Sequence, residues 1–123
     1  MIKINRLTHT GLISSNLELS RAFYEGLLGL TPNPGRPDFG FEGVWYDIGQ
    51  NQVHLMVVPN PYVDVVHPAH GGRDIHIAFA VDDVAQVRAE LERVGVAYSM
   101  SKSGRAALFC RDPDGNALEF SAV

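Results

Sequence analysis

Apolar residues recur at the spacing of an amphipathic helix in segment 16–28. Asn16 is suited to cap the first turn, and Gly29 follows as a stop signal. We therefore predict one helix here. The residues that we expect on its core-facing side are Leu19, Ala22, Phe23 and Leu27.

The same spacing returns in segment 82–94. Asp82 or Asp83 can cap its start, and Gly95 follows its last apolar residue. The two aspartates are interpreted as helix caps rather than as catalytic groups. The predicted apolar stripe of this second helix is Val84, Val87, Leu91 and Val94.

Short runs rich in β-branched and aromatic residues predict strands around these helices. They span 2–14, 44–48, 52–58, 74–81, 96–101, 106–111 and 117–121. Residues 112–116, Asp-Pro-Asp-Gly-Asn, have the composition of a turn between the last two strands. Segments 31–43 and 59–73 hold the prolines and glycines typical of loops.

The order of these elements is repeated in the two halves of the chain. A shift of 67 residues places His9 on His76, and a shift of 65 places His54 on Glu119. We therefore predict an α+β fold with two β-α-β-β-β modules inside a single domain, residues 1–123. The first module covers 1–58, the second covers 74–123, and residues 59–73 link them.

Composition limits the possible classes of function. The chain has 123 residues, of which 46% are hydrophobic and 20% charged, as in an ordinary globular domain. The formal net charge is −4 without any basic run, so we expect no nucleic-acid partner. No apolar run approaches the roughly 20 residues of a membrane span, and no export signal is recognisable.

The single cysteine, Cys110, cannot form an internal disulfide. It lies in the apolar run Ala-Ala-Leu-Phe-Cys, which favours a small buried side chain over a reactive thiol. Together with the missing export signal, this predicts a cytoplasmic protein.

Four metal-ligand side chains stand at matched positions of the repeat. His9 and His76 lie on the first strand of each half, and His54 and Glu119 lie on the last. Three imidazoles and one carboxylate suit one divalent ion, Zn, Ni, Co, Fe or Mn, with positions left open for substrate. The alternative is that each histidine is a half-buried core residue and that Glu119 belongs to an ion pair.

Strand alternation supports the metal interpretation. His76 lies opposite the large apolar side chains of its strand, and His54 and Glu119 do the same in theirs. The face of His9 is shared with apolar residues and is less clearly defined. The apolar set expected opposite His76, against a helix, is Ile75, Ile77, Phe79 and Val81.

The chain resembles the vicinal oxygen chelate superfamily, which includes glyoxalase I, bleomycin-resistance proteins and extradiol dioxygenases. The likeness is carried by segments 7–30, 71–84 and 111–120, the last of which reads RDPDGNALEF. It implies two modules that curl into a cup-shaped mixed sheet with helices outside. It also implies one divalent metal held at the positions of His9, His54, His76 and Glu119, and a homodimer whose cups form within one chain or between two.

For chemistry, the resemblance implies Lewis-acid catalysis on a substrate that offers two neighbouring oxygens to the metal. Glu119 then acts as the catalytic base that moves a proton. Glyoxalase I binds glutathione through polar residues at the positions of Ile13 and Val58, and both are apolar here. This difference argues against glutathione as the cosubstrate.

Further residues are candidates for substrate binding. Arg105 can bind an anionic group, with an exposed hairpin tip as the alternative. Trp45, Phe39 and Tyr46 can form the apolar wall of a pocket, or belong to the core or a dimer contact. The loop residues His67 and His70 can form a lid or supply a base, or simply lie at the surface.

We therefore expect a metal-dependent lyase or isomerase of the glyoxalase type that acts on a small oxygen-rich molecule. The first alternative is an antibiotic- or toxin-resistance protein that binds a small molecule or adds a nucleophile to it. A dioxygenase-like member of the superfamily is the second alternative. A non-catalytic dimeric scaffold is the third.

Overall fold

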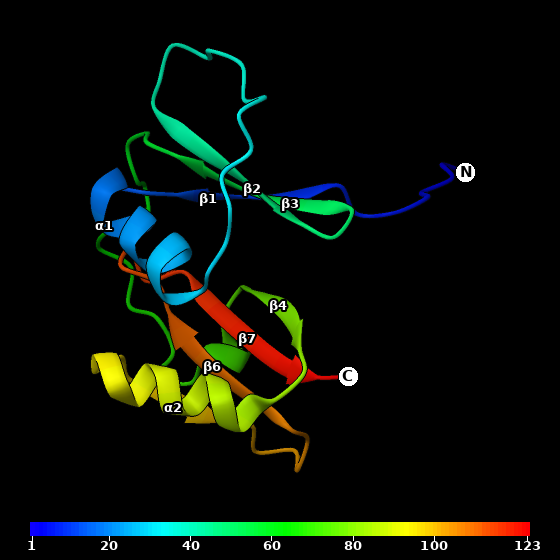
Figure 1. Cartoon of the computed structure of the whole chain (residues 1–123), viewed down its shortest axis with the longest axis vertical. Helices are drawn as coiled ribbons and strands as arrows, with labels where there is room; N and C mark the ends of the chain where they lie inside the picture. The colour runs from blue at the N-terminus through cyan, green and yellow to red at the C-terminus, as the bar shows by residue number, and fades with distance from the viewer. The chain divides into compact units, whose positions relative to one another are not determined.

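The computed structural model describes all 123 residues and divides them into two compact units, Met1–Asn60 and Pro61–Val123 (Figure 1). Each unit has its own sheet and its own α-helix. The α+β class predicted from the repeat is confirmed.

The first unit contains a three-stranded mixed sheet in the order β1-β3-β2. Strand β1 runs parallel to β3, and β2 forms an antiparallel hairpin with β3. The elements are β1 (His9–Ile13), α1 (Leu17–Arg21), the π-helical segment η1 (Ala22–Leu27), β2 (Gly43–Ile48) and β3 (Asn51–Met56).

Asn16 caps the first helix as predicted, because its side-chain oxygen accepts a hydrogen bond from the Leu19 amide at 3.1 Å. The predicted core-facing stripe is wrong at Leu19, which is 57% exposed, and at Ala22, which is also exposed. Phe23 is buried as predicted, and the other buried residues of α1 and η1 are Ser20 and Tyr24. The three stand at spacing i, i+3, i+4 from Ser20.

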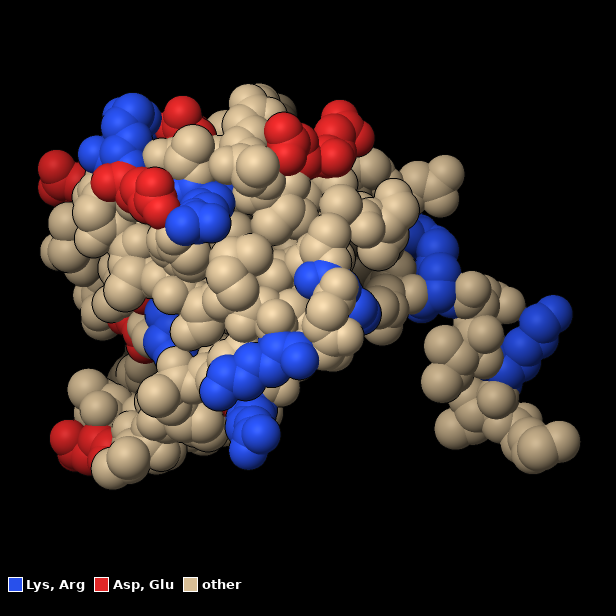
Figure 2. Space-filling view, turned by 90° about the horizontal axis from the view of Figure 1, so that it is seen from below, with Lys and Arg blue, Asp and Glu red and all other residues tan.

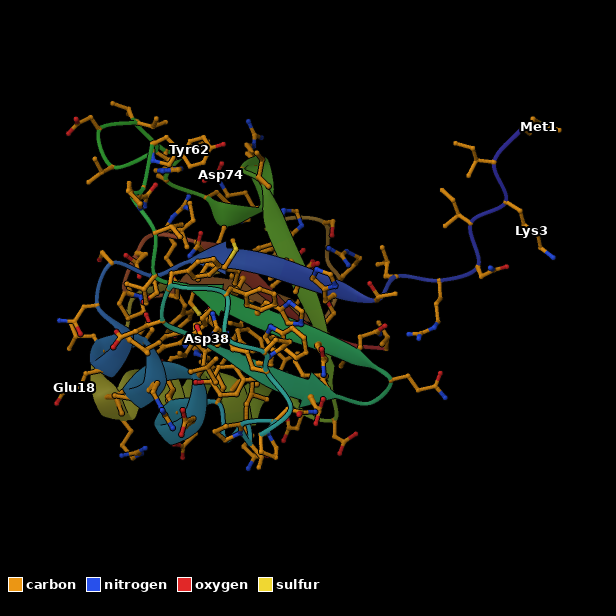
Figure 3. All side chains as sticks on the ribbon, turned by 90° about the horizontal axis from the view of Figure 1, so that it is seen from above. Met1, Lys3, Glu18, Asp38, Tyr62 and Asp74 are labelled. Atoms are coloured by element: carbon orange, nitrogen blue, oxygen red, sulfur yellow. The ribbon has the colours of Figure 1, made fainter.

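The first strand is shorter than predicted, because residues 1–8 form no ladder. The register pairs His9 with Gln52, and β3 begins at Asn51. Residues before Thr8 therefore have no strand beside them. Figure 3 shows Met1 and Lys3 on a segment that runs away from β1.

The first module also lacks a full third strand after its helix. Only an isolated bridge between Pro32 and Tyr46 marks its place. Pro32 and Pro34 have no amide hydrogen to donate, so a regular ladder cannot form in this loop.

The second unit holds a four-stranded mixed sheet in the order β4-β7-β6-β5, and α2 packs against β6 and β7 (Figure 1). Asp83 caps α2, and Gly95 ends it in the left-handed conformation at φ 76°, as predicted. The elements are the short 3-10 helix η2 (Gly71–Arg73), β4 (His76–Val81), α2 (Val84–Val94), β5 (Tyr98–Met100), β6 (Ala107–Arg111) and β7 (Ala117–Ala122).

Strand β4 alternates as expected, with Ile77, Phe79 and Val81 less exposed than the residues between them. The prediction fails at Ile75, which is 94% exposed. Ile75 precedes the first paired residue of β4, His76, so no ladder fixes its direction.

Asp112 organises the predicted turn between β6 and β7. Its carboxylate accepts hydrogen bonds from the amides of Asp114 and Asn116 and from the Asn116 side chain, at 2.8–3.0 Å. Gly115 has φ 86°, a conformation that glycine tolerates best.

None of the helices is long and apolar enough to cross a membrane. On the face shown in Figure 2, Lys and Arg side chains occur together with Asp and Glu, and much of the surface is uncharged.

Candidate functional site

The two predicted ligands of the first unit lie on neighbouring parallel strands. His9 is opposite Gln52, and His54 is opposite Gly11, so the histidines stand two positions apart on one face. Their rings stack with centroids 4.1 Å apart and planes 13° apart. The sheet therefore places the two imidazoles in direct contact.

Trp45 of β2 continues this stack on the other side. It is the register partner of His54, and the two ring centroids are 4.3 Å apart with an interplanar angle of 9°. His54 is thus held between His9 and Trp45. A ring clamped in this way loses little rotational freedom on binding a ligand.

A chain of hydrogen bonds fixes the tautomer of His54. Asp47 only accepts, so the Gln52 amide nitrogen must donate to it, at 2.8 Å. The Gln52 oxygen then accepts from Nε2 of His54, also at 2.8 Å. The neutral ring therefore keeps its lone pair on Nδ1, which is the atom available to a metal.

The pKa of His54 lies below its usual value. Burial is the main cause, and electrostatic interactions with His9 and Arg36 lower the pKa further. A lowered pKa keeps the imidazole neutral near pH 7, as a metal ligand must be.

The second unit repeats the same register. His76 is opposite Ala117, and Glu119 is opposite Ala78, so these two also stand two positions apart on one face. Glu119 is only 6% exposed. The internal repeat of the sequence therefore corresponds to the same strand pairing at both ligand pairs.

His76 and Glu119 approach each other on one face of the sheet. Nδ1 of His76 donates to the backbone oxygen of Asp74 at 2.9 Å, which leaves the lone pair of the neutral ring on Nε2. Nε2 lies 3.8 Å from Oε2 of Glu119. The two side chains are therefore close enough to hold one cation together.

Arg105 holds the other oxygen of Glu119. Its Nη2 donates to Oε1 at 2.6 Å, while the arginine side chain stays 57% exposed. The guanidinium therefore compensates the charge of the buried carboxylate and leaves Oε2 directed at His76. Arg105, expected from the sequence to bind substrate, therefore contacts Glu119, one of the predicted metal ligands.

The donor chemistry fits a divalent ion. Imidazole nitrogen and carboxylate oxygen bind zinc at about 2.0–2.2 Å, so two ligands of one ion stand at most about 4.3 Å apart. The 3.8 Å separation of His76 and Glu119 lies within this limit. The structure holds no group of three or more His, Cys, Asp or Glu side chains arranged for a metal, so it gives the predicted ligands as two pairs.

Other candidates from the sequence have structural partners. Tyr46 is fully buried, and its hydroxyl donates to Glu25 at 2.8 Å, so it belongs to the core of the first unit. His67 pairs with Asp74 at 2.7 Å. Nε2 of His70 donates to the Met100 backbone oxygen at 3.1 Å, which fastens the linker to β5.

Sequence reasoning missed three residues of the site. Gln52 orients His54, and Phe109, the register partner of Glu119, packs its ring edge-on at 5.6 Å from His76. Arg36 lies among the aromatic residues of the first unit. Residue type alone gives no signal for Gln52 or Phe109, because their roles follow from strand register.

Comparison with known proteins places these features in a family. The family model described as Glyoxalase/Bleomycin resistance protein/Dioxygenase superfamily matches residues 6–120. "Glyoxylase I 4" of Arabidopsis thaliana is 29% identical over 126 residues, which cover 96% of this chain and 71% of that protein.

Solved structures agree on the fold. A glyoxalase family protein of Bacillus anthracis superposes with a TM-score of 0.76 and 25% identity, covering 98% of this chain and 96% of that one. Lactoylglutathione lyase of Agrobacterium tumefaciens superposes with a TM-score of 0.70 and 22% identity. The superposition covers 98% of this chain and 95% of that one. The chain therefore belongs to the Glyoxalase/Bleomycin resistance protein/Dioxygenase superfamily.

Proposed function

We propose that the protein is a metal-dependent lyase or isomerase of the glyoxalase type. His9, His54, His76 and Glu119 would hold one divalent ion, within one chain or between two chains. The observation that carries the proposal is the 3.8 Å approach of Nε2 of His76 to Oε2 of Glu119, with Nδ1 of His76 donating to the Asp74 backbone oxygen. Family membership supports the same interpretation.

The metal would supply Lewis-acid stabilisation of negative charge on the substrate oxygens. Glu119 accepts the proton that the substrate loses from carbon and returns it to the product. Oε2, which would leave the metal for this step, is the base, because Oε1 is held by Arg105 at 2.6 Å. The buried position of the carboxylate keeps water away from the transferred proton.

The substrate class is a small, oxygen-rich molecule. With three neutral imidazoles and one carboxylate, a divalent ion leaves the site at a charge of about +1, which favours an anionic chelating group. The name of the Agrobacterium tumefaciens neighbour includes lactoylglutathione, but Ile13 and Val58 offer no polar group to glutathione in this chain. We propose a homodimer in the cytoplasm as the working form.

A resistance protein that only binds its small molecule is the second candidate, favoured by the family description. The two functions differ at Glu119. A lyase or isomerase needs its carboxylate for turnover, whereas a binding protein keeps its affinity for the small molecule after Glu119→Gln.

Exchange of substrate hydrogen for solvent deuterium tests the reaction without knowledge of the product. Metal-loaded protein is incubated in D₂O with hydroxyacetone or glycolaldehyde, two small hydroxycarbonyl compounds, and the loss of the C–H signal is followed by NMR. We expect exchange in the wild-type protein and at least a 100-fold loss in Glu119→Gln.

Glu90→Gln is the matched control, because Glu90 forms an exposed ion pair with Arg93 on α2. It should leave exchange unchanged. Equal exchange rates in wild type and Glu119→Gln would overturn the role of Glu119. Metal binding without exchange on any small hydroxycarbonyl compound would favour the resistance protein.

A further inference from the structure

A continuous column of flat groups runs through the first unit and ends on a cation. It begins with the stacked rings of His9, His54 and Trp45 described above. Phe39 follows, with its ring centroid 6.1 Å from that of Trp45. The Arg36 guanidinium carbon lies 5.1 Å above the Phe39 ring.

Arg36 is held in place on several sides. Its guanidinium also lies 5.4 Å from the centre of the Phe41 ring, and its Nη2 donates to the Phe41 backbone oxygen at 3.0 Å. A Cβ added at Gly43 would lie 2.8–2.9 Å from Nη2 and Nε, so the missing side chain makes room for the guanidinium. The cation is therefore positioned before any ligand arrives.

Arg36 has donors to spare. None of the ion pairs of the structure includes it, and its one hydrogen bond uses a single donor of the five in a guanidinium. A half-buried arginine without a carboxylate partner is suited to bind an anion through bidentate hydrogen bonds.

Apolar surface lies beside this cation. Phe39 is 50% exposed and Phe41 37%, and the two rings stack at 5.8 Å. Exposed aromatic rings can pack against a flat apolar group of a ligand. The positive charge of Arg36 also reaches His54, whose pKa it helps to lower.

We propose that Arg36, Phe39 and Trp45 form the specificity site for the substrate, which is an aromatic anion. Its ring packs against the exposed part of Phe39, beside Trp45, and its carboxylate or phosphate group binds the Arg36 guanidinium. This inference deepens the proposed function and rests on it only for the reaction, because all three residues lie in the first unit.

Trp45 is the one tryptophan of the chain and reports binding directly. Protein stripped of metal with EDTA is titrated with phenylphosphonate, benzoate, inorganic phosphate and benzyl alcohol while Trp45 fluorescence is recorded. We expect a saturable change with phenylphosphonate, or with benzoate if the group recognised is a carboxylate. Phosphate lacks the ring and benzyl alcohol lacks the charge, so each should bind at least 10-fold more weakly.

Arg36→Gln should weaken binding of the aromatic anion at least 10-fold. Arg36→Lys should weaken it less, because lysine keeps the positive charge but cannot form the two parallel hydrogen bonds of a guanidinium. Phe39→Leu should remove the preference for phenylphosphonate over phosphate, because the ring contact is lost. Arg93→Gln, on α2 of the other unit, is the matched control and should change nothing. Circular dichroism checks the fold of each variant.

The proposal is overturned if the wild-type protein shows no saturable change, or if Arg36→Gln binds as the wild type does. Should Arg36→Gln fail to fold, Phe39→Leu decides, since an unaltered preference for phenylphosphonate there excludes the aromatic site. Because EDTA removes the metal, failure of the metal proposal leaves this titration unaffected. The two failures are therefore distinguishable.

Discussion

The ring of His54 donates from Nε2 to the amide oxygen of Gln52 at 2.8 Å. This contact orients a predicted metal ligand, and partners of this kind typically contribute 10- to 100-fold to metal affinity. Gln52→Leu should therefore weaken binding of Zn²⁺ or Ni²⁺ by about 10- to 100-fold without unfolding the protein. Calorimetric titration of chelator-treated protein measures the change.

Gln50→Leu, in the exposed turn beside it, is the control and should bind like the wild type. If Gln52→Leu also retains full affinity, His54 is not positioned through this hydrogen bond.

Arg105 and the proposed metal share the carboxylate of Glu119. The guanidinium lies 2.6 Å from Oε1, and a second cation beside it is disfavoured by repulsion. Arg105→Gln should therefore raise metal affinity several-fold, because the repulsion between the two cations is removed. It should also slow deuterium exchange, because Arg105 no longer holds Oε1 and the carboxylate loses its fixed orientation. An unchanged affinity and an unchanged exchange rate would show that the contact of Arg105 with Glu119 affects neither metal binding nor proton transfer.

Asp74 introduces a pH dependence of stability. The Arg111 guanidinium, which donates to its carboxylate at 2.8 Å, holds the pKa of Asp74 below the ordinary value of 3.8. Because the pKa of Asp74 is lower in the folded protein than in the unfolded chain, its ionised carboxylate stabilises the fold. This stabilisation is fully present above pH 3.8 and is lost as the pH falls through the pKa of Asp74 in the folded protein.

Urea denaturation of wild type and Asp74→Asn measures this effect. The variant should be less stable at pH 7, and the difference in free energy of unfolding should shrink below pH 3.8. Asp64→Asn, in the exposed linker, should show no such difference. A gap between wild type and Asp74→Asn that stays constant with pH would contradict the assignment.

Cys110 should be unreactive in the folded protein. Burial raises the pKa of its thiol to about 12, with a smaller contribution from Asp112, and the residue is only 3% exposed. Since the thiolate is the reacting form, iodoacetamide at pH 8 should label it about 10³-fold more slowly than an ordinary thiol. Rapid labelling of native protein would contradict its position in the core.

The local signals of the sequence were sufficient for most elements. Asn16 and Asp83 cap the helices as expected, because capping depends on neighbouring residues alone. Strand length depends on partners far along the chain, so the shortening of β1 to His9–Ile13 could not be predicted.

The candidate site was predictable only in part for the same reason. The repeat indicated His54 and Glu119 because residue identity and spacing are visible in the sequence. The contacts that orient them, from Gln52 and Arg105, depend on strand register and on hairpin conformation. The exposed position of Leu19 likewise follows from how α1 packs, and helical spacing alone does not determine it.

Metal content of protein purified without chelators or a metal-affinity tag tests the central claim most directly. Elemental analysis should find about one Zn, Ni, Co, Fe or Mn per site, with a large loss in His54→Ala, His76→Ala and Glu119→Ala. Loss on both sides of the repeat is required, because His54 belongs to one unit and Glu119 to the other. Wild-type protein that binds no divalent ion even after soaking, or full metal content in the variants of either unit, would contradict the proposed metal site.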